Sequence, residues 1–163
     1  MNNNSEAFIK IVKHPFKFRM FLLAKLPSAY FSGVRVKYID NNKCEVTVPF
    51  KWFSQNPFKS IYFACLSMAA EMSTGALAMA HLHKRNPAVS MLVVKNESAY
   101  FKKAVNRTTF TCEDGALINQ MIEDSIASGE SRTVTATSIG KNEQGELVAE
   151  FKITWSFKTR TNK

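Results

Sequence analysis

The chain is poor in cysteine, which limits the chemistry it can support. Only three of its 163 residues are cysteine, namely Cys44, Cys65 and Cys112, and they form no C-x-x-C pair. An odd number of widely spaced cysteines argues against a disulfide framework. The three histidines add no recognisable zinc-ligand spacing. We therefore expect no metal.

The chain also lacks a long hydrophobic run. No segment approaches the roughly 18 consecutive apolar residues that read as a membrane span. The apolar stretch Met20–Ala24 is bounded by Arg19 and Lys25 and is too short for the apolar region of a signal peptide. These features predict a mature N-terminus at Met1, a cytoplasmic location and no integral membrane association.

Acidic residues are scarce in the N-terminal part of the chain. Residues 1–60 hold ten Lys or Arg against three acids, whereas residues 113–163 hold six against eight, within a net charge of +9. Such a surplus attracts a polyanion, such as nucleic acid, an anionic membrane surface or a phosphorylated cofactor, or is merely a solvated face. We find no helix-turn-helix, RNP-like or metal-finger pattern, so we do not expect nucleic acid as a partner.

Length and hydrophobic patterning predict one α+β domain over residues 1–163. The hydrophobic content of 45% is sufficient for one globular core. We expect an N-terminal helical segment within residues 1–28, broken near Pro15, and a long central helix over 58–83. A further helix is expected over 115–126, and strands over 33–39, 44–48, 89–94, 108–112, 133–139 and 147–157. This order predicts a mainly antiparallel sheet wrapped around the central helix.

The central helix carries a single formal charge. Between Lys59 and Lys84 that charge belongs to Glu71, and most other residues are small or apolar. A buried carboxylate is costly unless a partner or a function compensates for it. Glu71 is therefore either a structural group with a partner or a general base or nucleophile in a pocket.

The order of these features resembles the hotdog-fold acyl-CoA thioesterases, in particular the branch that includes the phenylacetate-degradation thioesterases. Asn56 matches the loop Asn of that family, and Glu71 matches the acid of its central helix. The segments 97–104 and 145–149 are similar to the strand and turn after the helix and to the last hairpin. The resemblance spans about residues 33–157 and implies the hotdog fold.

The sequence departs from the family at the start of the central helix. Nine residues before Glu71, where the family has His-Gly-Gly, the chain has Tyr62, Phe63 and Ala64. The resemblance implies that backbone N–H groups around Tyr62 and Phe63 hold the thioester oxyanion, that Asn56 orients substrate or water, and that Glu71 acts as base or nucleophile. No cofactor is implied beyond coenzyme A as part of the substrate.

Two basic clusters are candidates for the phosphates of coenzyme A. The resemblance favours the turn that carries Lys102, Lys103 and Arg107, and Lys84 with Arg85 form the second candidate. It also implies a homodimer or tetramer with sites that combine residues of two subunits.

Other functions stay open. The loss of His-Gly-Gly favours a non-catalytic acyl-CoA-binding protein, and Phe16–Leu26 suits either an interfacial membrane helix or a cap on the open face of the sheet, which we favour.

Overall fold

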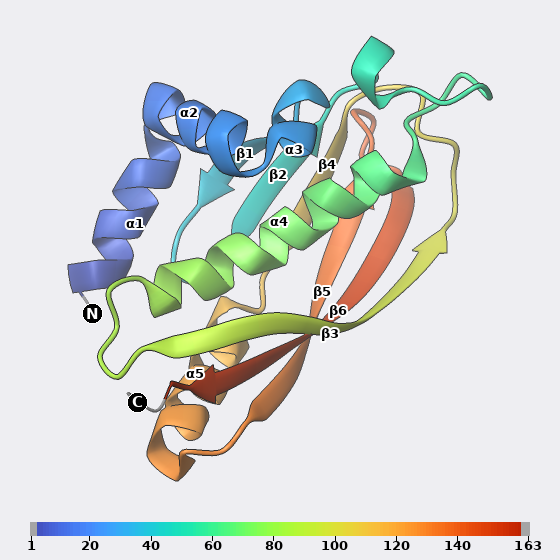
Figure 1. Cartoon of the computed structure of the whole chain (residues 1–163). Coiled ribbons are helices and arrows are strands. Elements are labelled where there is room, and N and C mark those ends of the chain that lie inside the picture. Colours follow the sequence, from blue (N-terminus) through green and yellow to red (C-terminus); the bar gives the residue numbers. More distant parts are fainter. Residues whose placement is uncertain (1–2, 161–163) are drawn as a thin grey trace.

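The computed structural model describes residues 3–160, in which one sheet wraps around one long helix (Figure 1). The sheet order is β1-β2-β4-β5-β6-β3, and all neighbouring strands are antiparallel. This arrangement confirms the predicted α+β class. The ends of the predicted 1–163 domain, residues 1–2 and 161–163, lie outside the described residues. The elements are α1 (Asn3–Lys13), α2 (Pro15–Lys25), α3 (Pro27–Phe31), β1 (Arg35–Ile39), β2 (Cys44–Val48), a 3₁₀ turn η1 (Trp52–Ser54), α4 (Phe63–Leu82), β3 (Val89–Tyr100), β4 (Thr108–Cys112), α5 (Gly115–Ser128), β5 (Arg132–Lys141) and β6 (Leu147–Thr159).

Helix α4 is the central helix and forms the middle of the core. It packs against β2, β4 and β5, and its fully buried positions are mostly small, with Ala69, Ala70 and Ala78 at zero exposure. Small side chains allow the sheet to approach the helix closely. By length and composition α4 would be able to cross a membrane, but most of it is buried within the domain, so it is a core helix.

Helix α4 begins at Phe63 rather than at residue 58 as predicted. The preceding backbone donors already have partners outside a helix. The N–H of Phe58 donates to Asn56 Oδ1 at 3.0 Å, and the N–H of Ile61 donates to the carbonyl of Ala104 at 2.8 Å. Because these bonds hold the chain in a loop, the helix cannot propagate toward its N-terminus.

The N-terminal segment consists of three helices. Pro15 separates α1 from α2 as predicted, and His14 caps α2 by accepting the N–H of Lys17 at 3.4 Å. Helix α1 packs against α4 and β1. By contrast, α2 buries only Leu22 completely, and the side chain of Phe16 is 69% exposed. We expected Phe16–Leu26 to cover the open face of the sheet, but α1 provides most of this cover.

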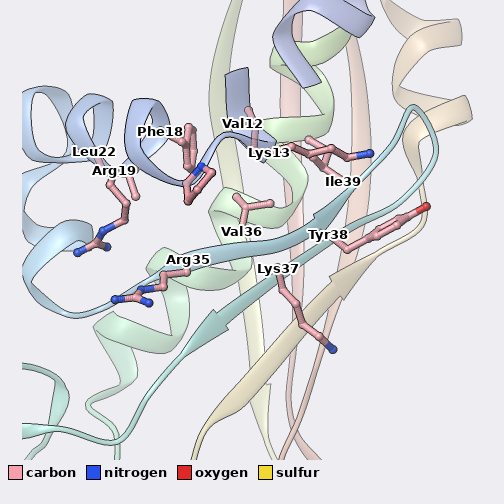
Figure 2. A pocket seen from close by; sticks show the side chains of 11 residues that line it. Val12, Lys13, Phe18, Arg19, Leu22, Arg35, Val36, Lys37, Tyr38 and Ile39 are labelled. Carbon is pink, nitrogen blue, oxygen red and sulfur yellow. The ribbon is translucent and has the colours of Figure 1, made fainter. Parts of the chain in front are cut away.

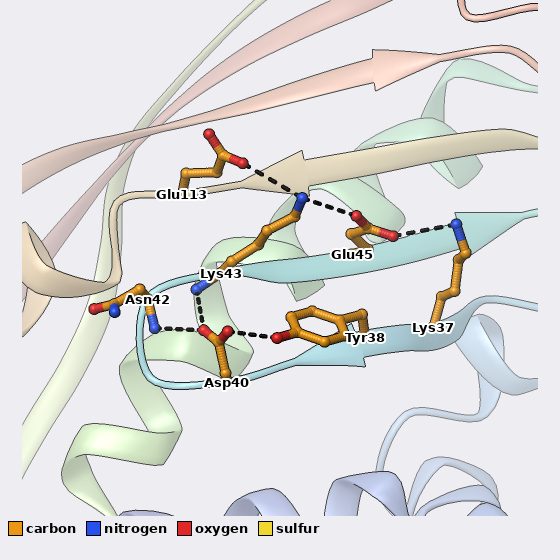
Figure 3. Close-up of polar contacts among 7 residues, drawn as sticks. All are labelled: Lys37, Tyr38, Asp40, Asn42, Lys43, Glu45 and Glu113. Carbon is orange, nitrogen blue, oxygen red and sulfur yellow. Dashed lines mark hydrogen bonds and ion pairs between the residues drawn. The ribbon is translucent and has the colours of Figure 1, made fainter. Parts of the chain in front are cut away.

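The hairpin β1–β2 turns at Asp40, which fixes the turn with its carboxylate. Asp40 accepts the N–H groups of Asn42 and Lys43 at 2.8 and 2.7 Å and the hydroxyl of Tyr38 at 2.6 Å (Figure 3). Burial acts to raise the pKa of Asp40, but these three hydrogen bonds outweigh it and hold the pKa below its ordinary value. The hairpin places β1 at one edge of the sheet.

Strand β3 forms the opposite edge and is longer than predicted. The sequence indicates a strand over 89–94, but pairing with β6 continues from Val89 opposite Thr159 to Tyr100 opposite Ala149. The added half is polar and exposed, so hydrophobic alternation does not reveal it. Its order comes from the backbone ladder with β6.

Candidate active site

A pocket of about 620 Å³ lies at the N-terminus of α4, and we call it the α4 pocket. One wall is the loop that precedes α4, and the other is the segment that follows β3. The structure thus brings together Asn56, Tyr62 and Phe63 with Lys102 and Lys103, although more than 35 residues separate the two segments in the sequence. Further aromatic and aliphatic side chains line it, among them Phe58, Ile61, Leu66, Tyr100 and Phe101.

The first turn of α4 presents two free backbone donors to this region. Among the described residues, the N–H groups of Phe63 and Ala64 have no acceptor, as is usual in a first helical turn. The N–H of Tyr62 is not available, because it donates to the carbonyl of Ser54 at 2.7 Å. This corrects the expectation for Tyr62: the donors that remain for an oxyanion are those of Phe63 and Ala64.

Asn56 organises the loop before α4. Its side-chain oxygen accepts the N–H groups of Phe58 and Ser60 at 3.0 and 3.2 Å and the hydroxyl of Ser60 at 3.2 Å. The oxygen is therefore fully used within the loop. The resemblance implies that Asn56 orients substrate or water. Only its side-chain NH₂ group is left for that role.

Glu71 lies on α4 but does not line the α4 pocket. Glu71 is nine positions after Tyr62, a distance of roughly 13 Å along a helix. The side chain is half-buried, and burial raises the pKa of its carboxyl above the ordinary value. Within residues 3–160 no hydrogen bond or ion pair reaches the carboxylate, so it lacks the partner that a purely structural role would supply.

Gly75 and Trp155 form the surroundings of the Glu71 carboxylate. A Cβ atom at Gly75 would lie 3.0 Å from Glu71 Oε1 and 3.2 Å from Trp155 Cζ2. The indole N–H of Trp155 donates to Thr74 Oγ1 at 2.9 Å, and that hydroxyl donates to the carbonyl of Glu71 at 3.0 Å. Sequence reasoning missed these neighbours, although the spacing of four between Glu71 and Gly75 places both on one face of α4.

The structure divides the first basic cluster. Lys103 lines the α4 pocket, and Lys102, which also lines it, forms an ion pair with Glu146 at 2.6 Å. Arg107 faces a different depression, of about 640 Å³, which it shares with Arg35. The three cations are close in the sequence but do not line one common pocket.

The second basic cluster lies at the other end of α4. The guanidinium of Arg85 forms an ion pair with Glu123 of α5, and its side chain is only 14% exposed. The carbonyl of Lys84 accepts the side-chain NH₂ of Asn4 at 3.1 Å. These contacts tie α4 to α5 and to α1, far from Phe63, so neither residue joins the α4 pocket.

Comparisons with known proteins agree with this architecture. Residues 17–157 match the model of a family described as "Domain of unknown function (DUF4442)". No curated protein matches the sequence significantly.

Solved structures resemble the chain over most of its length. A Pseudomonas aeruginosa protein described as of unknown function and "Probable Thioesterase" is 18% identical with a TM-score of 0.72, over 98% of this chain and 99% of that one. A Haemophilus influenzae thioesterase is 10% identical with a TM-score of 0.61, over 86% and 88%. A mutant thioesterase of Pseudomonas aeruginosa is 12% identical with a TM-score of 0.66, over 91% and 96%.

At these identities the likeness establishes the fold, and the neighbours are of the hotdog type. With the family match over residues 17–157, it follows that the chain belongs to the family described as Domain of unknown function (DUF4442) and has the hotdog fold.

Proposed function

We propose that this protein hydrolyses acyl thioesters, with acyl-CoA as substrate and Glu71 as general base or nucleophile. The observation that carries the proposal is the state of Glu71: a half-buried carboxylate on the core helix, without a polar partner in the described chain and with a raised pKa. A buried carboxylate without a partner lowers the stability of the fold. Such groups are therefore found mainly at functional sites, where their chemistry is used. The thioesterases among the structural neighbours support this reaction class.

The chemistry needs few groups. Above its raised pKa Glu71 is ionised, and it is then a stronger base than an exposed glutamate. It takes a proton from water as the water oxygen attacks the thioester carbon, or it attacks that carbon itself. The C–S bond then breaks, and the thiolate leaves and takes up the proton that Glu71 removed from water. In the nucleophilic route the acyl group is left on Glu71 as an anhydride, and a water molecule hydrolyses this anhydride, supplies the thiol proton and restores the carboxylate. The N–H groups of Phe63 and Ala64 would stabilise the oxyanion.

Within one chain, Glu71 lies about two helical turns away from the N–H groups of Phe63 and Ala64. We therefore propose that the site forms in a dimer. The outer edge of β3 has no strand partner within residues 3–160, and Leu92 on it is 66% exposed. A long unpaired edge with exposed apolar side chains favours pairing with a second copy. The thioesterases that the chain resembles combine residues of two subunits in each site, and we propose that in a two-fold dimer through β3 Glu71 of one subunit faces the α4 N-terminus of the other.

The α4 pocket is the proposed entrance for the coenzyme A portion. Lys103 provides a cation for phosphate there, and Lys102 provides a second one that Glu146 partly neutralises. Aromatic side chains such as Phe101, which is exposed, are suited to contact with adenine or the acyl chain.

The test is Glu71→Gln, assayed with a panel of acyl-CoA esters by thiol release. The substitution keeps the shape and removes the base, so we expect kcat to fall by about 10²-fold or more with acyl-CoA binding retained. Glu143→Gln is the matched control, because Glu143 is exposed on the β5–β6 turn. Unchanged turnover in Glu71→Gln would refute the catalytic assignment.

A non-catalytic acyl-CoA-binding protein is the second candidate. It is favoured by the start of α4, where Phe63 and Ala64 replace the two glycines of the thioesterases that the chain resembles and Tyr62 replaces their histidine. The large side chain of Phe63 lines the α4 pocket. This candidate predicts acyl-CoA binding but no turnover in the wild type, so the same panel separates the two functions.

A further inference from the structure

A second pocket lies at the other edge of the sheet, and we call it the β1 pocket. It has a volume of about 270 Å³ and lies between α1 and α2 on one side and β1 on the other (Figure 2). It shares no lining residue with the α4 pocket. Its volume is just below the range of about 300–1,000 Å³ that is usual for drug-sized ligands, so it suits a small molecule.

The charged side chains that line the β1 pocket are all cationic. They are Lys13, Arg19, Arg35 and Lys37. Two acids near the pocket are already engaged: Glu45 pairs with Lys37 at 3.2 Å, and Asp40 accepts three hydrogen bonds from its own hairpin (Figure 3). A third, Glu143, lines the neighbouring depression with Arg35 but not the β1 pocket. Within residues 3–160 neither Arg19 nor Arg35 forms an ion pair. Two guanidinium groups therefore remain without a counter-charge.

Arg19 is held in place with a donor unused. Its guanidinium lies over the ring of Tyr30, 3.9 Å from the ring centre. Its Nη1 atom is buried and has no hydrogen-bond acceptor. A buried guanidinium nitrogen without an acceptor is unfavourable, and it points to a missing anion. In Figure 2 the guanidinium groups of Arg19 and Arg35 extend toward the same end of the pocket, and Lys13 extends toward the other end.

The rest of the β1 pocket is apolar. Val12 and Leu22 from the helices and Ile39 from β1 are buried, and Phe18 is half-buried against them. A ligand for this pocket therefore needs an oxyanion for the arginines and a short apolar body for this wall. Guanidinium groups suit both carboxylate and phosphate through paired N–H donors.

We infer that the β1 pocket binds a small amphiphilic oxyanion, a carboxylate or a phosphate monoester on a short apolar chain, between Arg19 and Arg35. This site is separate from the α4 pocket and does not depend on the proposed hydrolysis.

The experiment is calorimetric titration of the full chain at low ionic strength with octanoate, octyl phosphate, neutral octanamide and inorganic phosphate. We expect one of the two amphiphilic anions to bind at least tenfold more tightly than octanamide and than inorganic phosphate. Which of the two binds more tightly identifies the head group. Equal binding of octanamide would overturn the role of the arginines, and equal binding of inorganic phosphate would overturn the role of the apolar wall.

Variants locate the binding. Arg19→Met keeps an unbranched side chain over Tyr30, and we expect it and Arg35→Gln each to weaken the preferred anion at least tenfold. Lys17→Gln is the matched control, since Lys17 lies on α2 outside the pocket lining, and it should change affinity less than twofold. Equal weakening by Lys17→Gln, or binding that survives both arginine variants, would overturn the site. If Arg19→Met does not fold, Arg35→Gln decides alone, because Arg35 is exposed.

Discussion

Gly75→Ala tests the geometry around Glu71 most directly. The new Cβ would lie 3.0 Å from Glu71 Oε1, and 3.2 and 3.3 Å from two ring atoms of Trp155. The carboxylate is the end of a flexible side chain and can move away. The indole cannot easily do so, because Trp155 is 4% exposed in β6 and is hydrogen-bonded to Thr74.

The expected change in stability follows from two opposing effects. Alanine in place of glycine within a helix stabilises by about 1 kcal/mol, and overpacking against a fixed neighbour costs about 1–3 kcal/mol. The net loss is about 0–2 kcal/mol, which for a domain of this size lowers Tm by about 0–8 °C. Displacement of the Glu71 carboxylate by even 1 Å should lower thioester hydrolysis by up to about 10²-fold.

The assay combines denaturant unfolding with steady-state hydrolysis on the same protein. Gly115→Ala is the contrast, because a Cβ there would lie 2.2 Å from the backbone oxygen of Asn41, which cannot rotate away. Gly115→Ala should therefore be the more destabilising of the two. If Gly75→Ala stabilises the fold by the full helix-propensity gain and leaves hydrolysis unchanged, the described position of Glu71 beside Gly75 is wrong.

Three further predictions concern the proposed site. Folding raises the pKa of Glu71, so the folded state loses stability as the pH rises from the ordinary glutamate pKa of about 4.3 through the raised pKa. Glu71→Gln should therefore raise Tm at pH 7, and this gain should vanish below about pH 4. Lys103→Gln should raise KM for acyl-CoA in a salt-sensitive way, whereas Arg85→Gln should lower Tm and leave KM unchanged; the reverse result would move the phosphate site to the other end of α4. Leu92→Lys on the β3 edge should give a monomer by light scattering and abolish hydrolysis, and an active monomer would exclude the shared site.

The sequence alone determined the central helix and singled out Glu71 as its one acid. A long stretch of small and apolar residues has to be buried, and a single acid within it is conspicuous because burial of charge is costly. The hairpin turns were also predictable, since Asp40 and Gly145 lie between alternating segments and suit turn geometry. These features depend on local composition, so they can be read from the chain.

The tertiary structure decided the rest of the site. The start of α4 depends on Ala104, a residue distant in sequence that accepts the N–H of Ile61. The length of β3 depends on its ladder with β6, and the separation of Arg107 from Lys103 depends on which face each side chain reaches. The pairing of Arg19 with Tyr30 is likewise visible only after folding. Contacts between distant segments set these properties, and the pattern of neighbouring residues carries no record of such contacts.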